Sequence, residues 1–350
     1  MKLIAFAKSL WERPSEKPNA DVPFLQLPAK VIHLIAKSLT PADIALLSQT
    51  CRSMRESLNK YPNAAALSRA DYFAYLAGMA RGLPNQWLCD YCMALHPIDK
   101  RDKPTTKWRP CSCPNYSVLA SHRRCRLQNP NIPFEHHHIQ LALKYTRLGQ
   151  RKYDSYLRAL LEPYQEWHFY TMGRRAIDHE AHYFAFPRIV TGGDGNPRYL
   201  LFSTCRYLGG GRDMLIQNLG CQDICPHLHF RDDGDYYQYN NNLFRAFQYA
   251  LEPKYHGHEW EAACPRCATD FSVTRRGRNL YLKVWQDFGP EGSPIDLAWR
   301  SQTFRPGLDG IENGPTEGPT LYHEPGSIKK LYGPVPEIPT TQKAVIDTTT

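Results

Sequence analysis

The chain has 350 residues, of which 42% are hydrophobic and 22% charged, with 28 Pro and 22 Gly. This length holds one large or two modest cores, and the composition predicts a folded body with irregular segments. The 43 Lys and Arg exceed the 34 Asp and Glu, giving a formal net charge of +9. Because the basic residues are spread along the chain, a mildly basic surface is favoured and nucleic-acid binding is unlikely from the charge alone.

No stretch of the sequence approaches the roughly 18 apolar residues that a membrane span needs. The apolar run at residues 3–7 is shorter than the core of a signal peptide. We therefore expect an intracellular protein, cytoplasmic or nuclear or both, with no membrane partner. The 11 Cys stand mostly in close pairs, which in a reducing compartment indicates metal ligation before disulfides.

The N-terminal part predicts a flexible leader at residues 1–22 and a three-helix module at residues 23–66. The first helix follows Pro28, which suits a helix start because it lacks an N–H that would have no partner there. Thr40 and Pro41 predict the start of a second helix, with Thr40 as its N-cap. We expect this second helix to continue through Ile44, Leu47, Cys51 and Met54 on one face.

The rest of the chain predicts a second region of mixed helix and strand. A helix is predicted over 64–79. The division at residues 67–130 holds most of this helix and then a Cys-rich stretch without a sustained period, as in a metal-organised loop. Residues 131–300 predict helices and then strands. The helices are predicted at 138–148 and 153–161, the strands at 183–190 and 199–207, and a hairpin at 271–274 and 280–285.

Residues 301–350 are rich in Pro and Gly, so we expect a disordered C-terminal tail that contributes little to stability. The fold class predicted for the whole chain is therefore α+β, with N-terminal helices, a zinc-stabilised mixed helix and strand domain, and this tail.

Two sets of Cys and His have the spacing of tetrahedral zinc sites. In the first set, Cys-x-x-Cys supplies two thiolates from a tight turn and a later Cys-x-Cys supplies two more; the second set offers three thiolates and one imidazole. Free thiols paired by chance are the alternative reading. The first set is Cys89, Cys92, Cys111 and Cys113, with His96 and Cys125 as substitutes. The second set is Cys225, His227, Cys264 and Cys267, with Cys221 and His229 as substitutes.

Neither set fits a catalytic zinc. A zincin needs His-Glu-x-x-His, but the segment from His258 to Glu259 lacks the second His. A zinc deaminase needs Pro-Cys-x-x-Cys, whereas Ala263 precedes Cys264. The triplet at 136–138 places adjacent His at a helix start, where the side chains point in different directions, so we expect a solvated cap region. The sequence predicts no enzyme and no catalytic residue.

The segment Phe24-Leu25-Gln26-Leu27-Pro28, with its following helix and the Thr40-Pro41-Ala42-Asp43 link, resembles the F-box. The family places a Cys and an Arg after the second helix, where Cys51 and Arg52 stand here, although Ile44 replaces a more common Leu. Three helices in about forty residues cannot bury all their apolar faces, so a stripe is left for a partner. The resemblance implies that this partner is a Skp-type adaptor, bound through Leu27, Pro28, Ile32, Ile35, Leu39, Leu47 and Cys51.

The resemblance extends over roughly residues 24–300 to a large group of fungal F-box proteins. These place a Cys-x-x-Cys and a Leu-His-Pro after the F-box, as the segments from Cys89 to Cys92 and from Leu95 to Pro97 do here. One departure concerns the element Arg-Phe-Cys-x-x-Cys, which appears only as Arg109-Pro110-Cys111-Ser112-Cys113. This departure leaves the ligands of the first zinc site open.

The resemblance implies a substrate-recognition subunit of an SCF ubiquitin ligase, in which the adaptor bridges to a cullin scaffold and other subunits transfer ubiquitin. The protein substrate is not readable from the sequence. Two alternatives stay open: a zinc-finger nucleic-acid-binding or regulatory protein, and an F-box protein acting outside ubiquitination. A Lys- and Arg-lined helix after either Cys motif would favour the nucleic-acid binder, and the sequence has none.

Overall fold

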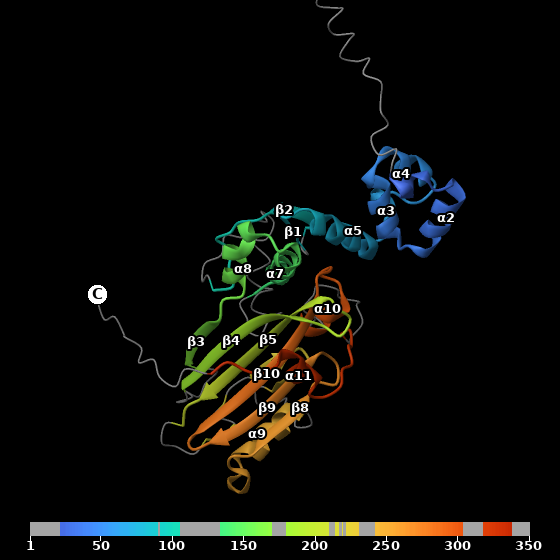
Figure 1. Cartoon of the computed structure of the whole chain (residues 1–350). Helices are drawn as coiled ribbons and strands as arrows, with labels where there is room; N and C mark the ends of the chain where they lie inside the picture. The colour runs from blue at the N-terminus through green and yellow to red at the C-terminus, as the bar shows by residue number, and fades with distance from the viewer. Residues whose placement is uncertain are drawn as a thin grey trace, which may run out of the picture. The chain divides into compact units, whose positions relative to one another are not determined.

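The structure is a computed structural model that describes residues 22–89, 92–105, 134–169, 180–209, 214–216, 219, 222–230, 242–303 and 318–337. The chain divides into two compact units, Met1–Met79 and Ala80–Thr350, referred to below as the N-terminal and C-terminal units. Figure 1 shows helices alone in the first and a large sheet with helices in the second.

The N-terminal unit is built from short helices that follow the predicted punctuation. The Thr40 hydroxyl accepts from the Asp43 N–H at 3.2 Å, so the predicted N-cap is confirmed. Pro28 is the N-cap residue of the preceding helix, one position before its first residue. The elements are η1 (Pro23–Gln26), α2 (Ala29–Ser38), α3 (Pro41–Thr50), α4 (Arg52–Ser57), η2 (Ala64–Ala66) and α5 (Arg69–Gly82).

The second helix is shorter than predicted. Cys51 has an extended backbone, with φ −159° and ψ 168°, and separates α3 from α4. The expectation that Cys51 and Met54 continue α3 is therefore wrong. After the break, Met54 of α4 packs into the same core as Ile32 and Ile44.

The C-terminal unit is organised by one antiparallel sheet of six strands in the order β3-β4-β5-β10-β9-β8. The predicted strands and hairpin are present and longer than expected, because pairing extends beyond their apolar stretches. The strands are β3 (Tyr164–Phe169), β4 (Glu180–Thr191), β5 (Pro197–Tyr207), β8 (Glu259–Ala263), β9 (Thr269–Arg276) and β10 (Asn279–Pro290). Among the described residues, two small hairpins lie outside it, β1 (Gln86–Cys89) with β2 (Ala94–Pro97) and β6 (Gln222–Cys225) with β7 (Leu228–Phe230).

One face of the six-stranded sheet carries the main core. Alternate residues of the central strands, such as Leu201, Val273 and Leu282, pack with apolar side chains of the helices. The core lies between this face and α7 (His136–Leu148), α8 (Asp154–Leu160), α9 (Asn242–Leu251) and α10 (Leu297–Thr303), with η4 (Arg151–Tyr153) and η6 (Pro253–Tyr255) beside them.

The opposite face of the sheet is covered in part by the C-terminal segment. Here α11 (Ser327–Tyr332) lies in front of β9 and β10 in Figure 1. Ile328 and Tyr332 are buried against Phe202 and Trp285. The expectation of a disordered tail from residue 301 is therefore wrong for residues 318–337, because a few apolar side chains among the Pro and Gly suffice to dock them.

The observed mixture of helix and strand, with helices at the N-terminus, agrees with the predicted class. Among the described residues, no helix is both long enough and apolar enough to cross a membrane.

Candidate functional site

The first candidate site is an apolar face of α2. Leu34 is 65% exposed and Val31 37% exposed. These two residues lie three positions apart, one turn along the same side of the helix, while Ile32 and Ala36 point into the core. An apolar side chain as exposed as Leu34, beside a second one, marks a surface suited to a partner helix.

The predicted adaptor residues differ in exposure: one is exposed, one is buried, and the others are half-buried. Pro28 is exposed, and Ile35 is half-buried. Ile32 is only 3% exposed, so a direct contact of this side chain with a partner is not supported, and its role is to hold α2 on the core. The remaining predicted residues are half-buried against that core: Leu27, Leu39, Leu47 and Cys51.

Sequence reasoning left Val31 and Leu34 out of the predicted contact set, although they are the exposed large apolar residues of α2. The signal was available in their spacing. The apolar residues of α2 fall on two sides of the helix, one through positions 32 and 36 and the other through positions 31 and 34–35. The side richer in small residues packs inward.

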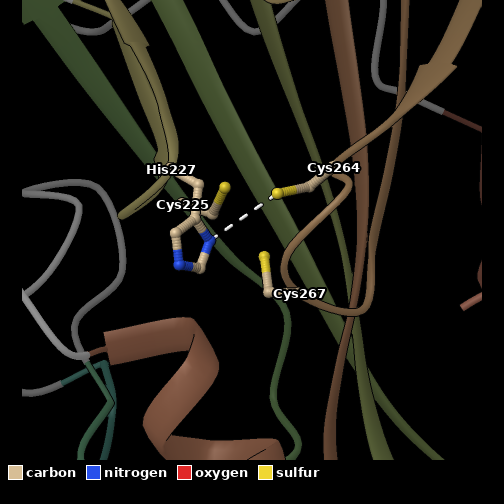
Figure 2. A group of neighbouring side chains, drawn as sticks. All are labelled: Cys225, His227, Cys264 and Cys267. Carbon is tan, nitrogen blue, oxygen red and sulfur yellow. Dashed lines mark hydrogen bonds between the residues drawn. The ribbon is translucent and has the colours of Figure 1, made fainter. Parts of the chain in front are cut away.

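The second candidate site joins Cys225, His227, Cys264 and Cys267, the second set expected from the sequence (Figure 2). One ligand atom from each residue lies within 4.8 Å of the others. Cys225 ends β6, and His227 follows in the turn to β7. Cys264 and Cys267 stand in the turn between β8 and β9, so the site connects the small hairpin to the main sheet.

One measured distance in the cluster is close to that expected for a tetrahedral ion. Bonds of about 2.3 Å to sulfur and 2.0 Å to nitrogen place those two ligand atoms roughly 3.5 Å apart. The separation of Cys264 Sγ and His227 Nδ1 is 3.6 Å. The backbone N–H of Arg266 also donates to Cys264 Sγ at 3.4 Å, which orients the sulfur within the turn.

The electrostatics of the cluster favour a cation. Burial raises the pKa of the Cys225 and Cys267 thiols, whereas hydrogen bonds from Cys225 and Cys267 lower the pKa of Cys264. Only one thiolate is thus stabilised by the protein groups themselves. A divalent cation at the centre lets all three thiols ionise, and with His227 it has four ligands and no open position for a substrate.

The third candidate site lies at the β1–β2 hairpin. Cys89, Cys92 and His96 approach one another, and Cys89 is fully buried. Cys92 Sγ and His96 Nε2 are 2.9 Å apart, a hydrogen-bond distance that is about 0.6 Å shorter than the separation of a sulfur and a nitrogen bound to one zinc. Burial lowers the pKa of His96, which favours the neutral imidazole that a metal requires.

The structure therefore brings together two of the four predicted ligands of the first set and adds the substitute His96. The other predicted ligands, Cys111 and Cys113, lie outside the described residues, as do the substitutes Cys125 and Cys221 and the side chain of His229.

A further group of potential ligands, separate from the two Cys sites, is the hydrogen-bonded cluster of Asp102, His137 and His138. The backbone N–H of Glu135 donates to His138 Nδ1 at 3.0 Å, so the proton of this ring resides on Nε2, which donates to Asp102 Oδ1 at 3.0 Å. That protonated nitrogen has no lone pair for a metal. His137 Nε2 lies 2.9 Å from Asp102 Oδ2.

The expectation of a solvated cap at 136–138 is wrong, since all three His are buried. Burial raises the pKa of Asp102, but hydrogen bonds from His137 and His138 outweigh it and hold that pKa well below its usual range. Burial lowers the pKa of His136 to about 3. The sequence could not reveal that the start of α7 would lie under other segments.

Comparison with known protein families gives one match, between residues 24–63 and the F-box domain. No curated protein and no solved structure matches the chain. The matched residues span η1 to α4, which contain the exposed face of α2 described above.

Proposed function

We propose that this chain, with its F-box domain at residues 24–63, is a substrate-recognition subunit of an SCF-type cullin ubiquitin ligase. F-box proteins usually act in this way by binding a Skp-type adaptor. The observation that carries the proposal is the exposed apolar face of α2 within the matched residues. Leu34 and Val31 are the anchors that we expect to enter the adaptor, with Ile35 and Pro28 at their side.

In this proposal the C-terminal unit binds the protein substrate and holds it for ubiquitin transfer. Ubiquitin transfer then belongs to other subunits, and the chain itself is not an enzyme. The four-ligand arrangement of the Cys225 site supports this reading, because a closed metal site braces a fold and offers no position to a reactant.

We further propose zinc as the metal of both Cys sites. Three thiolates and an imidazole whose ligand atoms all lie within 4.8 Å of one another suit zinc, which prefers sulfur and nitrogen ligands. For the site at the β1–β2 hairpin we propose Cys89, Cys92 and His96, completed by Cys111 or Cys113, with the separation of Cys92 Sγ and His96 Nε2 opening from 2.9 Å to about 3.5 Å when the ion binds. This revises the set expected from the sequence by exchanging one thiolate for the His96 imidazole.

The adaptor proposal is tested with the purified full chain and a Skp-type adaptor. We expect the two to co-elute, and Leu34→Glu to weaken their affinity at least tenfold, because an apolar anchor of this size contributes about 1.5–3 kcal/mol when buried. Leu297→Glu is the matched control, since Leu297 is 45% exposed and lies outside the F-box. Failure of the wild-type chain to bind would overturn the proposal.

The ligase proposal needs a second experiment. Affinity purification from the native host should enrich the adaptor, a cullin and at least one further protein, and Leu34→Glu should remove the first two and keep the third. Recovery of the adaptor without a cullin would instead support an F-box protein that acts outside ubiquitination.

A further inference from the structure

The C-terminal segment at residues 318–333, called the strap below, packs on one face of the six-stranded sheet through a few specific contacts. Ile328 and Tyr332 are buried in an apolar cluster with Phe202 and Trp285 of the sheet. The Tyr332 hydroxyl donates to the Phe186 carbonyl at 3.0 Å. These contacts come from side chains one helical turn apart, so α11 presents a single narrow face to the sheet.

A buried carboxylate gives this surface its selectivity. Asp270 is 2% exposed and lies in the same cross-strand row as Trp285. Its two oxygens accept from the backbone N–H groups of Gly326, Ile328 and Lys329 at 2.8–2.9 Å, and one lies 3.1 Å from His323 Nε2. A ligand without free N–H groups in its first helical turn would leave this carboxylate without these donors, which is costly in a buried position.

Basic and acidic groups add a second element of recognition. The Lys329 ammonium pairs with Glu261 and lies 5.2 Å from the centre of the Trp285 ring. Arg188 of the sheet donates to the Tyr332 carbonyl at 2.7 Å and lies over the Tyr332 ring. The surface therefore accepts a short helix that carries an aliphatic residue, a Lys or Arg directly after it, and an aromatic residue four positions after the aliphatic one.

The strap also touches the metal site. Arg266 stands between Cys264 and Cys267, and its carbonyl accepts from the Leu321 N–H at 2.9 Å. Its guanidinium donates to the Gly318 carbonyl at 3.3 Å. Asp270 follows Cys267 by only three residues. An ion that fixes the turn from Cys264 to Cys267 thereby fixes the atoms to which the strap binds.

We propose that this face of the sheet is a docking site for a short helix of a partner protein, which the strap occupies in cis, and that metal at the Cys225 site strengthens docking. The inference rests on the proposed function, since the partner is the protein that the receptor recognises. The occupant that it names is a helix of the chemistry given above. Among the described residues of the strap, four side chains form the apolar part of this contact, Leu321, Ile328, Leu331 and Tyr332, so a short partner helix could present a comparable set.

The strap belongs to the same chain as the sheet, so its docking is intramolecular and competes with a free copy of the same segment. A free copy of the strap should therefore bind poorly to the intact chain and well to a chain whose own strap is weakened.

The test uses a fluorescent peptide of residues 318–337 and the full chain loaded with zinc. We expect the peptide to bind the variant Ile328→Ala/Tyr332→Ala at least tenfold more tightly than it binds the wild type. Lys329→Glu, which removes an exposed contact and changes no buried residue, should act in the same direction and serves if the double variant does not fold. Adding Asp270→Asn to either variant should reduce peptide binding at least tenfold.

Coupling to the metal gives an independent readout. By thermodynamic reciprocity, the factor by which metal strengthens peptide binding equals the factor by which peptide raises metal affinity in a chelator competition. Equal peptide binding by wild type and both variants, or no binding to a folded variant, would overturn the proposal. Adaptor binding is measured on the same samples. If the chain does not bind the adaptor but the variants still bind the peptide as expected, the proposed function is refuted and the proposal of a docking site is not.

Discussion

Replacing Cys264 by Ser is the sharpest test of the Cys225, His227, Cys264 and Cys267 site. The serine hydroxyl does not ionise at neutral pH, so the ion keeps two thiolates and one imidazole. Structural zinc contributes about 10–16 kcal/mol in small peptides, so one of four ligands is worth about 3 kcal/mol and roughly a hundredfold in affinity. Because metal binding is part of the folding free energy, we expect the midpoint of thermal unfolding to fall by about 6–12 °C.

The matched control is Cys205→Ser. Cys205 is equally buried, on β5 outside the cluster, and burial raises the pKa of its thiol to about 12, so it is a neutral packing residue. This variant should lose some stability and keep its metal. The assays are elemental analysis, chelator competition and thermal unfolding. Unchanged metal content and affinity in Cys264→Ser, or equal losses in the two variants, would refute the assignment of this site.

Three further predictions concern stability. Ile32→Ala should lower the free energy of unfolding by about 2–5 kcal/mol because it leaves a cavity, whereas Leu34→Ala should change it by at most about 0.5 kcal/mol. Denaturant titration measures both values. Equal losses of stability in the two variants would contradict the placement of these side chains. Asp102→Asn should destabilise the protein at pH 7. The folded pKa of Asp102 is depressed, so its contribution to stability is present above the unfolded pKa of about 3.9 and declines as the pH falls below that value. The difference in melting temperature between wild type and variant should therefore shrink below about pH 3.9. A difference that stays constant with pH would refute this prediction. Gly149→Ala should cost about 1 kcal/mol in the same titration, because Gly149 ends α7 with φ 58°, and no change would show that the residue tolerates a side chain.

Local sequence determined the features that depend on neighbouring residues. Thr40 and Pro41 begin α3 because a hydroxyl acceptor and a fixed φ suit a helix start wherever it lies. The strands of the hairpin around Gly277 could be read for the same reason, since alternation and a turn residue act over a few positions. The closeness of Cys264 and Cys267 was also readable, because Cys-x-x-Cys spacing lets two thiols approach one point from a tight turn.

Tertiary structure decided which of those residues are inside and which segments meet. Helical periodicity gave α2 two apolar sides, and only packing against Ile44 and Met54 decided that Ile32 points inward while Leu34 faces out. The histidines at the start of α7 were expected in solvent and lie buried around Asp102, which comes from a segment 35 residues earlier. The strap is the clearest case. Its composition indicated disorder, but the carboxylate of Asp270 and the ring of Trp285, each more than forty residues before Ile328 along the chain, supply the partners that order it. Local sequence cannot predict such partners, because contacts between residues that are distant along the chain depend on the whole fold.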